Sequence, residues 1–133
     1  FNNWAYHWRD LTNRYGVILS DIDGTADGQY DKIMVLGGRT ATFNGGTNIV
    51  TLLNAKGGKY KTGDTFDLVI AKTVTLTAAP ALAFSTNTYA YADFEGTLTK
   101  GTNGGILQTD QQSLRLTLTH VPPSSSGSLI IVR

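Results

Sequence analysis

The chain has 133 residues, which is enough to bury a hydrophobic core as one domain. Its 11 basic and 10 acidic side chains leave a net charge of +1, so it lacks the basic field that binding to a phosphate backbone requires. No apolar run approaches the roughly 20 residues that cross a bilayer, and the absence of cysteine excludes disulfides and cysteine-ligated zinc. We therefore expect neither nucleic-acid binding nor membrane insertion.

The first sixteen residues, FNNWAYHWRDLTNRYG, carry aromatic and apolar side chains at helical spacing: Trp4, Trp8, Leu11 and Tyr15. This spacing predicts a short amphipathic helix over residues 1–16 that caps one end of the core. Because Trp4, Tyr6 and Trp8 also alternate, a strand is the alternative. The same three aromatic side chains are candidates for stacking on a sugar ring.

From residue 17 onward, short apolar runs are separated by turns rich in glycine and asparagine. The pattern predicts strands over 17–19, 32–36, 39–43, 48–53, 65–70, 73–77, 89–94, 97–100 and 113–120. In the last run, Leu114, Leu116 and Leu118 alternate with polar residues and are expected to line one buried face. With no helical period after residue 16, residues 17–121 are predicted to form an all-β domain.

The C-terminal part has a different composition. Residues 122–128 are rich in proline and serine and are predicted to be a linker. Leu129, Ile130, Ile131 and Val132 follow, an apolar run without alternation within the segment 129–133. Such a run suits a strand buried on both faces, either returning to its own domain or completing a sheet of a neighbouring subunit.

The stretch DIDGTADGQYD, residues 21–31, raises the question of a calcium site. Asp21, Asp23, Asp27 and Asp31 are candidate ligands, because calcium prefers carboxylate oxygens. Neither register of an EF-hand loop supplies the bidentate glutamate at position 12, however. The simpler interpretation is a turn with aspartates accepting backbone N–H bonds and two glycines, Gly24 and Gly28, at positive φ. No other cofactor is expected.

An enzyme is not predicted. The two histidines, His7 and His120, lie near opposite ends of the chain, and no Gly-x-Ser-x-Gly motif is present. The glycine-rich stretches do not have the spacing of a phosphate-binding loop. The carboxylates supply no pair whose spacing marks a glycosidase.

Five short motifs follow one another between residues 23 and 70: DGT, GQYDKI, ATFNGGT, VTLL and GDTF. In order and spacing they resemble the repeat of bacterial autotransporter passenger domains and related surface proteins. The resemblance covers a little over a third of the chain, and residues 71–120 match loosely. It implies an exported, right-handed β-helical or sandwich-like surface module that is usually not an enzyme. It implies no catalytic residues, because the shared motif is structural.

Two architectures remain open from the sequence. Apolar runs about 20 residues apart favour a short right-handed β-solenoid. A two-sheet, jelly-roll-like β-sandwich would suit the same strands.

Only 16% of the residues are charged, and threonine, glycine and asparagine are abundant. This composition is typical of extracellular and virion β-proteins. The chain begins with Phe1, which indicates a processed N-terminus or a piece of a longer protein. We expect an extracellular or cell-surface structural protein that assembles with copies of itself into a filament, fibre or coat by β-strand exchange. The alternative is a glycan-binding adhesin, or a module on a virion surface for receptor binding or decoration.

Overall fold

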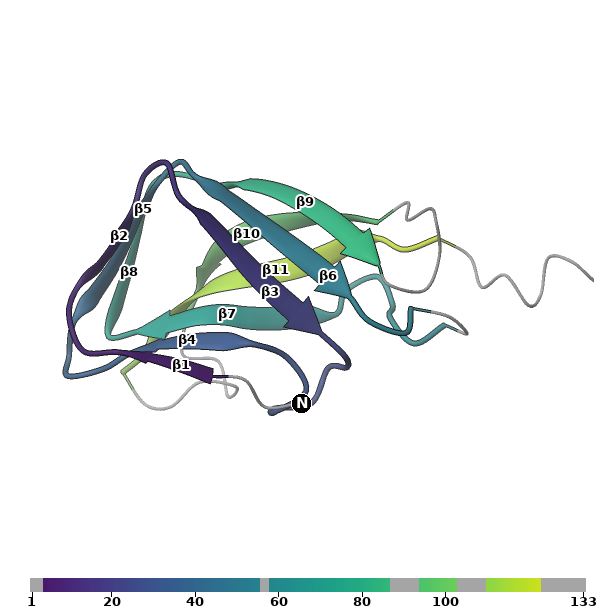
Figure 1. The fold of residues 1–133 in the computed structure, drawn as a ribbon, viewed down its shortest axis with the longest axis horizontal. Coiled ribbons are helices and arrows are strands. Elements are labelled where there is room, and N and C mark those ends of the chain that lie inside the picture. The colour runs from purple at the N-terminus through teal and green to yellow at the C-terminus, as the bar shows by residue number, and fades with distance from the viewer. Residues whose placement is uncertain (1–3, 56–57, 87–93, 103–109, 123–133) are drawn as a thin grey trace, which may run out of the picture.

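The computed structural model describes residues 4–55, 58–86, 94–102 and 110–122, and these residues form eleven strands and no helix. The all-β prediction is confirmed. Figure 1 shows the strands β1 (Trp4–His7), β2 (Leu11–Asn13), β3 (Val17–Ile22), β4 (Lys32–Val35), β5 (Thr40–Asn44), β6 (Thr47–Leu52), β7 (Thr65–Ala71), β8 (Thr73–Ala78), β9 (Ala81–Thr86), β10 (Glu95–Gly101) and β11 (Gln112–His120). Across these described ranges, no helix is long and apolar enough to span a membrane.

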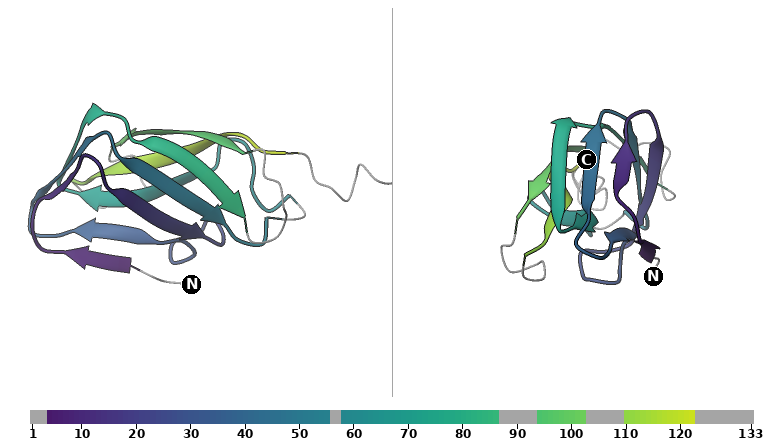
Figure 2. Two further views of the ribbon diagram at one scale, coloured as in Figure 1. Left: turned by 45° about the horizontal axis from the view of Figure 1, so that its top comes forward. Right: turned by 90° about the vertical axis from the view of Figure 1, so that its left-hand side faces the viewer.

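The first nine strands repeat one path three times. The chain runs through three sheets in turn, so that β1, β4 and β7 are parallel neighbours, as are β2, β5 and β8, and β3, β6 and β9. We call one passage through three strands a coil; Figures 1 and 2 show the three coils side by side. Val17 pairs with Thr47 and Thr47 with Ala81, so the repeat is longer than the spacing of about 20 residues expected from the sequence.

Alternation places the core between the sheets. Along β6, Asn48, Val50 and Leu52 are buried, while the residues between them are partly exposed. Pro80 is buried and lies directly before β9. The strand β9 was not predicted, because its alanines have a low β propensity.

The corner between the second and third sheets depends on glycine. Gly46 has a φ of 81°, and a Cβ there would lie 2.5 Å from Asn13 Nδ2. The buried Asn13 side chain accepts a hydrogen bond from the backbone N–H of Gly16, at 2.9 Å between the heavy atoms. The first and second coils therefore meet tightly at this corner.

The hairpin β10–β11 pairs antiparallel with β7, extends the sheet of β7 and covers the third coil. Leu114, Leu116 and Leu118 are fully buried, which confirms their predicted face. On β10, a Cβ at Gly96 would lie 3.1 Å from the Phe84 ring of β9, so the hairpin reaches the opposite sheet. Figure 1 shows β11 and β10 spanning from β7 towards β9.

A buried ion pair fastens the hairpin to the third coil. Asp67 on β7 is 1% exposed, and its Oδ1 accepts hydrogen bonds from Ser113 Oγ at 2.6 Å and Arg115 Nε at 2.7 Å. Arg115 Nη2 donates to Oδ2 at 3.3 Å, which makes the pair bidentate. Such geometry compensates the cost of burying the charge.

The predicted N-terminal helix is wrong. The segment contains β1 and β2, which pair in parallel with β4 and β5 and so belong to the same sheets as the rest of the domain. Backbone pairing with strands some 30 residues away overrides the helical spacing of the aromatic side chains.

Two predicted strands fall wholly or largely on residues that the structure does not describe. The strand expected over 89–94 lies outside them except for Phe94, which is not in a strand. The segment 129–133 and the linker after residue 122 also lie outside the described residues.

Candidate functional site

The site is the end of the molecule formed by the first coil. β1 and β3 are the outermost strands of their sheets on this side, and so is β2. Within the described part of the chain, each of the three therefore presents one row of backbone N–H and C=O groups without a neighbouring strand. A row of this kind is a template for pairing with another strand.

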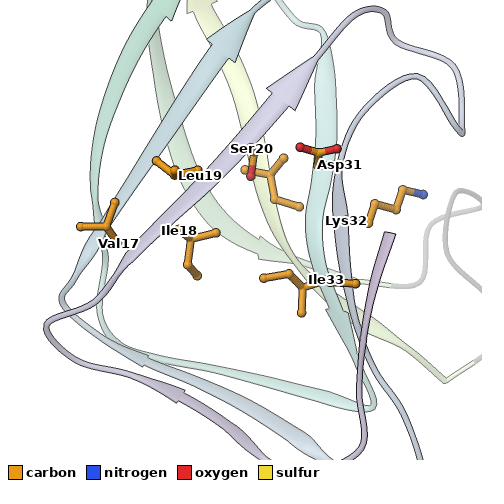
Figure 3. A pocket seen from close by; sticks show the side chains of 9 residues that line it. Val17, Ile18, Leu19, Ser20, Asp31, Lys32 and Ile33 are labelled. Atoms are coloured by element: carbon orange, nitrogen blue, oxygen red, sulfur yellow. The ribbon is translucent and has the colours of Figure 1, made fainter. Parts of the chain in front are cut away.

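Between β3 and β4 the core opens at this end. A cavity of about 310 Å³ has apolar walls from Ala5, Ile18, Ile33 and Leu68, and polar groups from Ser20, Asp31 and Lys32. Figure 3 shows Ile18 and Ile33 on the two strands that border the opening. Since Ile18 and Ile33 are partly buried and pack against the core, the cavity is continuous with the hydrophobic interior.

The outer face of β3 is apolar as well. Val17 is 57% exposed and Leu19 is 69% exposed, which is unusual for large aliphatic side chains in a strand. In the register of the sheet, Leu19 lies beside Ile49 of β6, which lies beside Ala83 of β9. The uncharged surface therefore continues across the sheet. The one charged residue of β3 is Asp21, next to the last residue of the strand.

The acidic stretch between β3 and β4 is a turn, as its simpler interpretation predicts. Ile22 and Tyr30 form an antiparallel bridge, and Asp23 N donates to Gln29 O at 2.8 Å. Gly28 has a φ of 86° as expected, but Gly24 does not adopt a positive φ. A Cβ at position 24 would lie 2.2 Å from Gln29 Oε1, so a larger residue there would displace the Gln29 side chain from its hydrogen bond with the backbone N–H of Ala26.

The carboxylates of Asp23, Asp27 and Asp31, three of the four predicted calcium ligands, make separate contacts, and Asp21 contributes its backbone N–H. Asp27 pairs with Lys32, and Asp23 accepts a hydrogen bond from Lys59 Nζ at 2.6 Å. Hydrogen bonds from Lys59 and then Asn54 lower the pKa of Asp23. Among the described residues, no three histidine, cysteine or acidic side chains are grouped so that they could hold a metal ion.

Asp31 is the acidic residue that lines the cavity. Its Oδ2 accepts a hydrogen bond from the backbone N–H of Asp21 at 2.9 Å, while its buried Oδ1 has no hydrogen-bond partner among the described residues. Burial raises the pKa of this carboxyl, and the bond from Asp21 partly opposes that shift. The open end thus combines an apolar interior with a carboxylate that is costly to ionise.

Two of the three predicted sugar-stacking side chains are on the surface. Tyr6 on β1 is 59% exposed and Trp8, just after it, is 68% exposed. The side chain of Trp4 lies outside the described residues. Tyr15, which sequence reasoning assigned to the core-capping face of the predicted helix, is 82% exposed, and its ring centroid lies 5.1 Å from Arg14 Cζ.

Sequence reasoning also missed the exposed pair Val17 and Leu19. The signal was the run Val17-Ile18-Leu19, which does not alternate and so predicts apolar side chains on both faces of one strand. The two histidines are not brought together, because β4 and β7 lie between β1 and β11 in the sheet that carries them.

No protein-family model matches the chain, and comparisons with curated proteins and with solved structures found no match.

Proposed function

We propose that the protein is a short right-handed β-solenoid that acts as a structural subunit and assembles with copies of itself into an extracellular filament, fibre or surface coat. The observation that carries the proposal is the contrast between its ends: the hairpin β10–β11 closes over the third coil, while the first coil presents three edge strands around an apolar opening. Repeated coils of this kind are stable when their ends are covered.

Assembly would use β-strand complementation. The segment Leu129–Val132 of one subunit adds a strand to an open sheet edge of the next, and main-chain hydrogen bonds supply the pairing. Burial of its apolar side chains stabilises the contact by roughly 25 cal/mol per Å² of apolar area, offset by the ordering of the segment. No catalytic group is required for this role.

An extracellular or cell-surface location, with a virion surface as the alternative, is part of the proposal. It is supported by the charge-poor composition and by the resemblance to autotransporter passenger repeats in residues 23–70. The parallel pairing of the first nine strands across the three sheets is consistent with the β-helical architecture that this resemblance implies.

Deletion of residues 124–133 tests the proposal. The expected result is loss of assemblies in negative-stain electron microscopy, with an unchanged far-ultraviolet circular dichroism spectrum. A full-length variant, Ile130→Lys with Ile131→Lys, keeps the chain length and should have the same effect. Assemblies that persist in both variants would contradict strand complementation by this segment.

Glycan binding is the second candidate, because Tyr6 and Trp8 expose most of their surface. Aromatic rings with one apolar face stack on the apolar face of a sugar ring. A glycan array that compares the unmodified chain with Trp4→Ala, Tyr6→Ala and Trp8→Ala variants tests this role. Binding that depends on these rings, without concentration-dependent assembly, would favour an adhesin over a filament subunit.

A further inference from the structure

We infer that β3 is the edge that accepts the segment Leu129–Val132, in parallel register, with Leu129 beside Val17 and Arg133 beside Asp21. The inference rests on the proposed self-assembly, because it identifies the acceptor strand for the same donor. Its grounds are the length of β3, the apolar surroundings on both of its faces, and the position of its charge.

The three edges of the first coil differ in what they offer. β2 has three residues, and it lies between the charged side chains of Asp10 and Arg14. β1 has four residues, and two of them are the polar-tipped Tyr6 and His7. β3 has six residues, of which the first four, Val17–Ser20, carry no charge. An uncharged stretch of four residues matches the four apolar residues of the donor.

Both faces of the donor find apolar surroundings at β3. A strand paired with β3 in parallel alternates its side chains in step with it. Ile130 would then lie beside Ile18 at the cavity, where Ile33 and Leu68 also contribute. Leu129 and Ile131 would lie on the outer face beside Val17 and Leu19. Successive apolar residues of the donor would thus meet apolar neighbours on both faces, whereas a half-exposed strand usually has a polar outer face and alternates.

The parallel direction and the register have independent support. The neighbours β3, β6 and β9 are all parallel, so a parallel strand continues the hydrogen-bonding pattern of this sheet. With Leu129 beside Val17, the fifth position pairs Arg133 with Asp21, which places opposite charges directly side by side. Shifting the donor by one residue would separate these charges and move its side chains to the other face.

Disulfide trapping tests the acceptor, because the chain contains no cysteine. Two full-length variants, Leu19→Cys and Ile131→Cys, are mixed under mild oxidation, with an affinity tag on one so that the mixed dimer is identified by mass. Neighbouring strands bring the two Cα atoms within disulfide range, so a mixed disulfide dimer is expected. The matched control is Ala83→Cys with Ile131→Cys, at the opposite edge of the same sheet, and it should lose the cross-link.

The outcomes separate this inference from the proposed function. Assembly with equal or greater cross-linking at Ala83 than at Leu19 would overturn β3 as acceptor while leaving self-assembly intact. A third full-length variant carries both Leu19→Cys and Ile131→Cys. If it forms the disulfide within one chain while the two single variants form no mixed dimer, the result would support β3 as acceptor and contradict assembly between copies. A mixed dimer that forms at Leu19 and not at Ala83 supports both.

Charge reversal tests the register without a covalent bond. Asp21→Arg should weaken assembly several-fold, since it places like charges side by side, and Arg133→Asp combined with it should restore assembly. The effect should shrink at high salt. If the double variant assembles no better than Asp21→Arg alone, the proposed register is wrong.

Discussion

β10, the outermost strand of the hairpin, and β3, an outermost strand at the open end, differ in the residues that they expose. β10 carries Glu95 and Lys100 as exposed residues, while Leu98 is buried. Charged residues on an edge discourage pairing with a further strand. β3 instead exposes Val17 and Leu19 and carries no charge over its first four residues. β10 and β3 belong to different sheets, and the difference indicates that β10 terminates its own sheet whereas β3 is suited to extending its own.

The ends also differ in how their polar groups are satisfied. At the hairpin, the buried carboxylate of Asp67 has three hydrogen bonds from Ser113 and Arg115. At the open end, the buried Oδ1 of Asp31 has no hydrogen-bond partner within the residues described. Completed polar networks stabilise a fold, whereas an unsatisfied buried group costs free energy. This contrast can be tested by substitutions at each end.

The largest expected effect is at the hairpin. Asp67→Ala leaves Arg115, which is mostly buried, without its carboxylate and should lower the free energy of unfolding by about 3–5 kcal/mol. Urea denaturation monitored by circular dichroism measures the change. The control is Lys72→Ala, which removes an exposed pair with Asp110 at 4.0 Å and should cost less than about 1 kcal/mol. Equal effects of the two substitutions would contradict a stabilising role for the buried pair.

The next effect compares the same substitution at both ends. Leu116→Ala removes a fully buried side chain and should lower the free energy of unfolding by about 2–5 kcal/mol. Leu19→Ala, at a side chain that is 69% exposed, should change it by less than about 0.5 kcal/mol at protein concentrations too low for assembly. A large loss of stability in dilute Leu19→Ala would show that Leu19 is already covered within its own chain.

The smallest effect is the pH dependence at the open end. Because burial raises the pKa of Asp31 above 3.8, the folded protein holds this proton more tightly than the unfolded chain. The free energy of unfolding therefore falls as the pH rises from 3.8 through the folded pKa of Asp31, because Asp31 must lose its proton while buried. Asp31→Asn, whose amide oxygen can still accept the Asp21 N–H, should gain stability relative to the unmodified chain as the pH rises through that window.

Asp23 provides the opposite case in the same turn. Its pKa is lowered, so its contribution to stability is present above 3.8 and is lost as the pH falls through its folded pKa. Asp23→Asn should therefore lose stability relative to the unmodified chain as the pH rises from the folded pKa of Asp23 to 3.8. Denaturation curves for Asp31→Asn above pH 3.8 and for Asp23→Asn below pH 3.8 check the signs. Two variants that shift in the same direction would contradict the assigned environments.

Local pattern was enough to predict much of the fold. Leu114, Leu116 and Leu118 alternate with polar residues, and their buried face follows from the two-residue period of a strand. Turns rich in glycine and asparagine were used as strand boundaries, and they located most of the remaining strands, β3 to β8, β10 and β11.

Parallel pairing could not be predicted in the same way. Leu11 pairs with Ala41, and this contact between distant residues decides that the N-terminal segment is a strand. The repeat length and β9 depend on the same kind of pairing, which leaves little trace in local sequence. At the candidate site, the partner of Asp23 is Lys59, 36 residues away, so the acidic turn alone could not show that its charges are paired.

Sedimentation velocity over a range of concentrations tests the central claim, that the open edge at β3 drives self-assembly. The comparison uses the unmodified chain, Leu19→Lys at the open edge and Ala83→Lys at the opposite edge of the same sheet. We predict concentration-dependent assemblies for the unmodified chain and for Ala83→Lys, and monomers for Leu19→Lys, because a lysine on an edge strand blocks pairing. A monomeric unmodified chain, or a Leu19→Lys variant that assembles equally well, would contradict the claim.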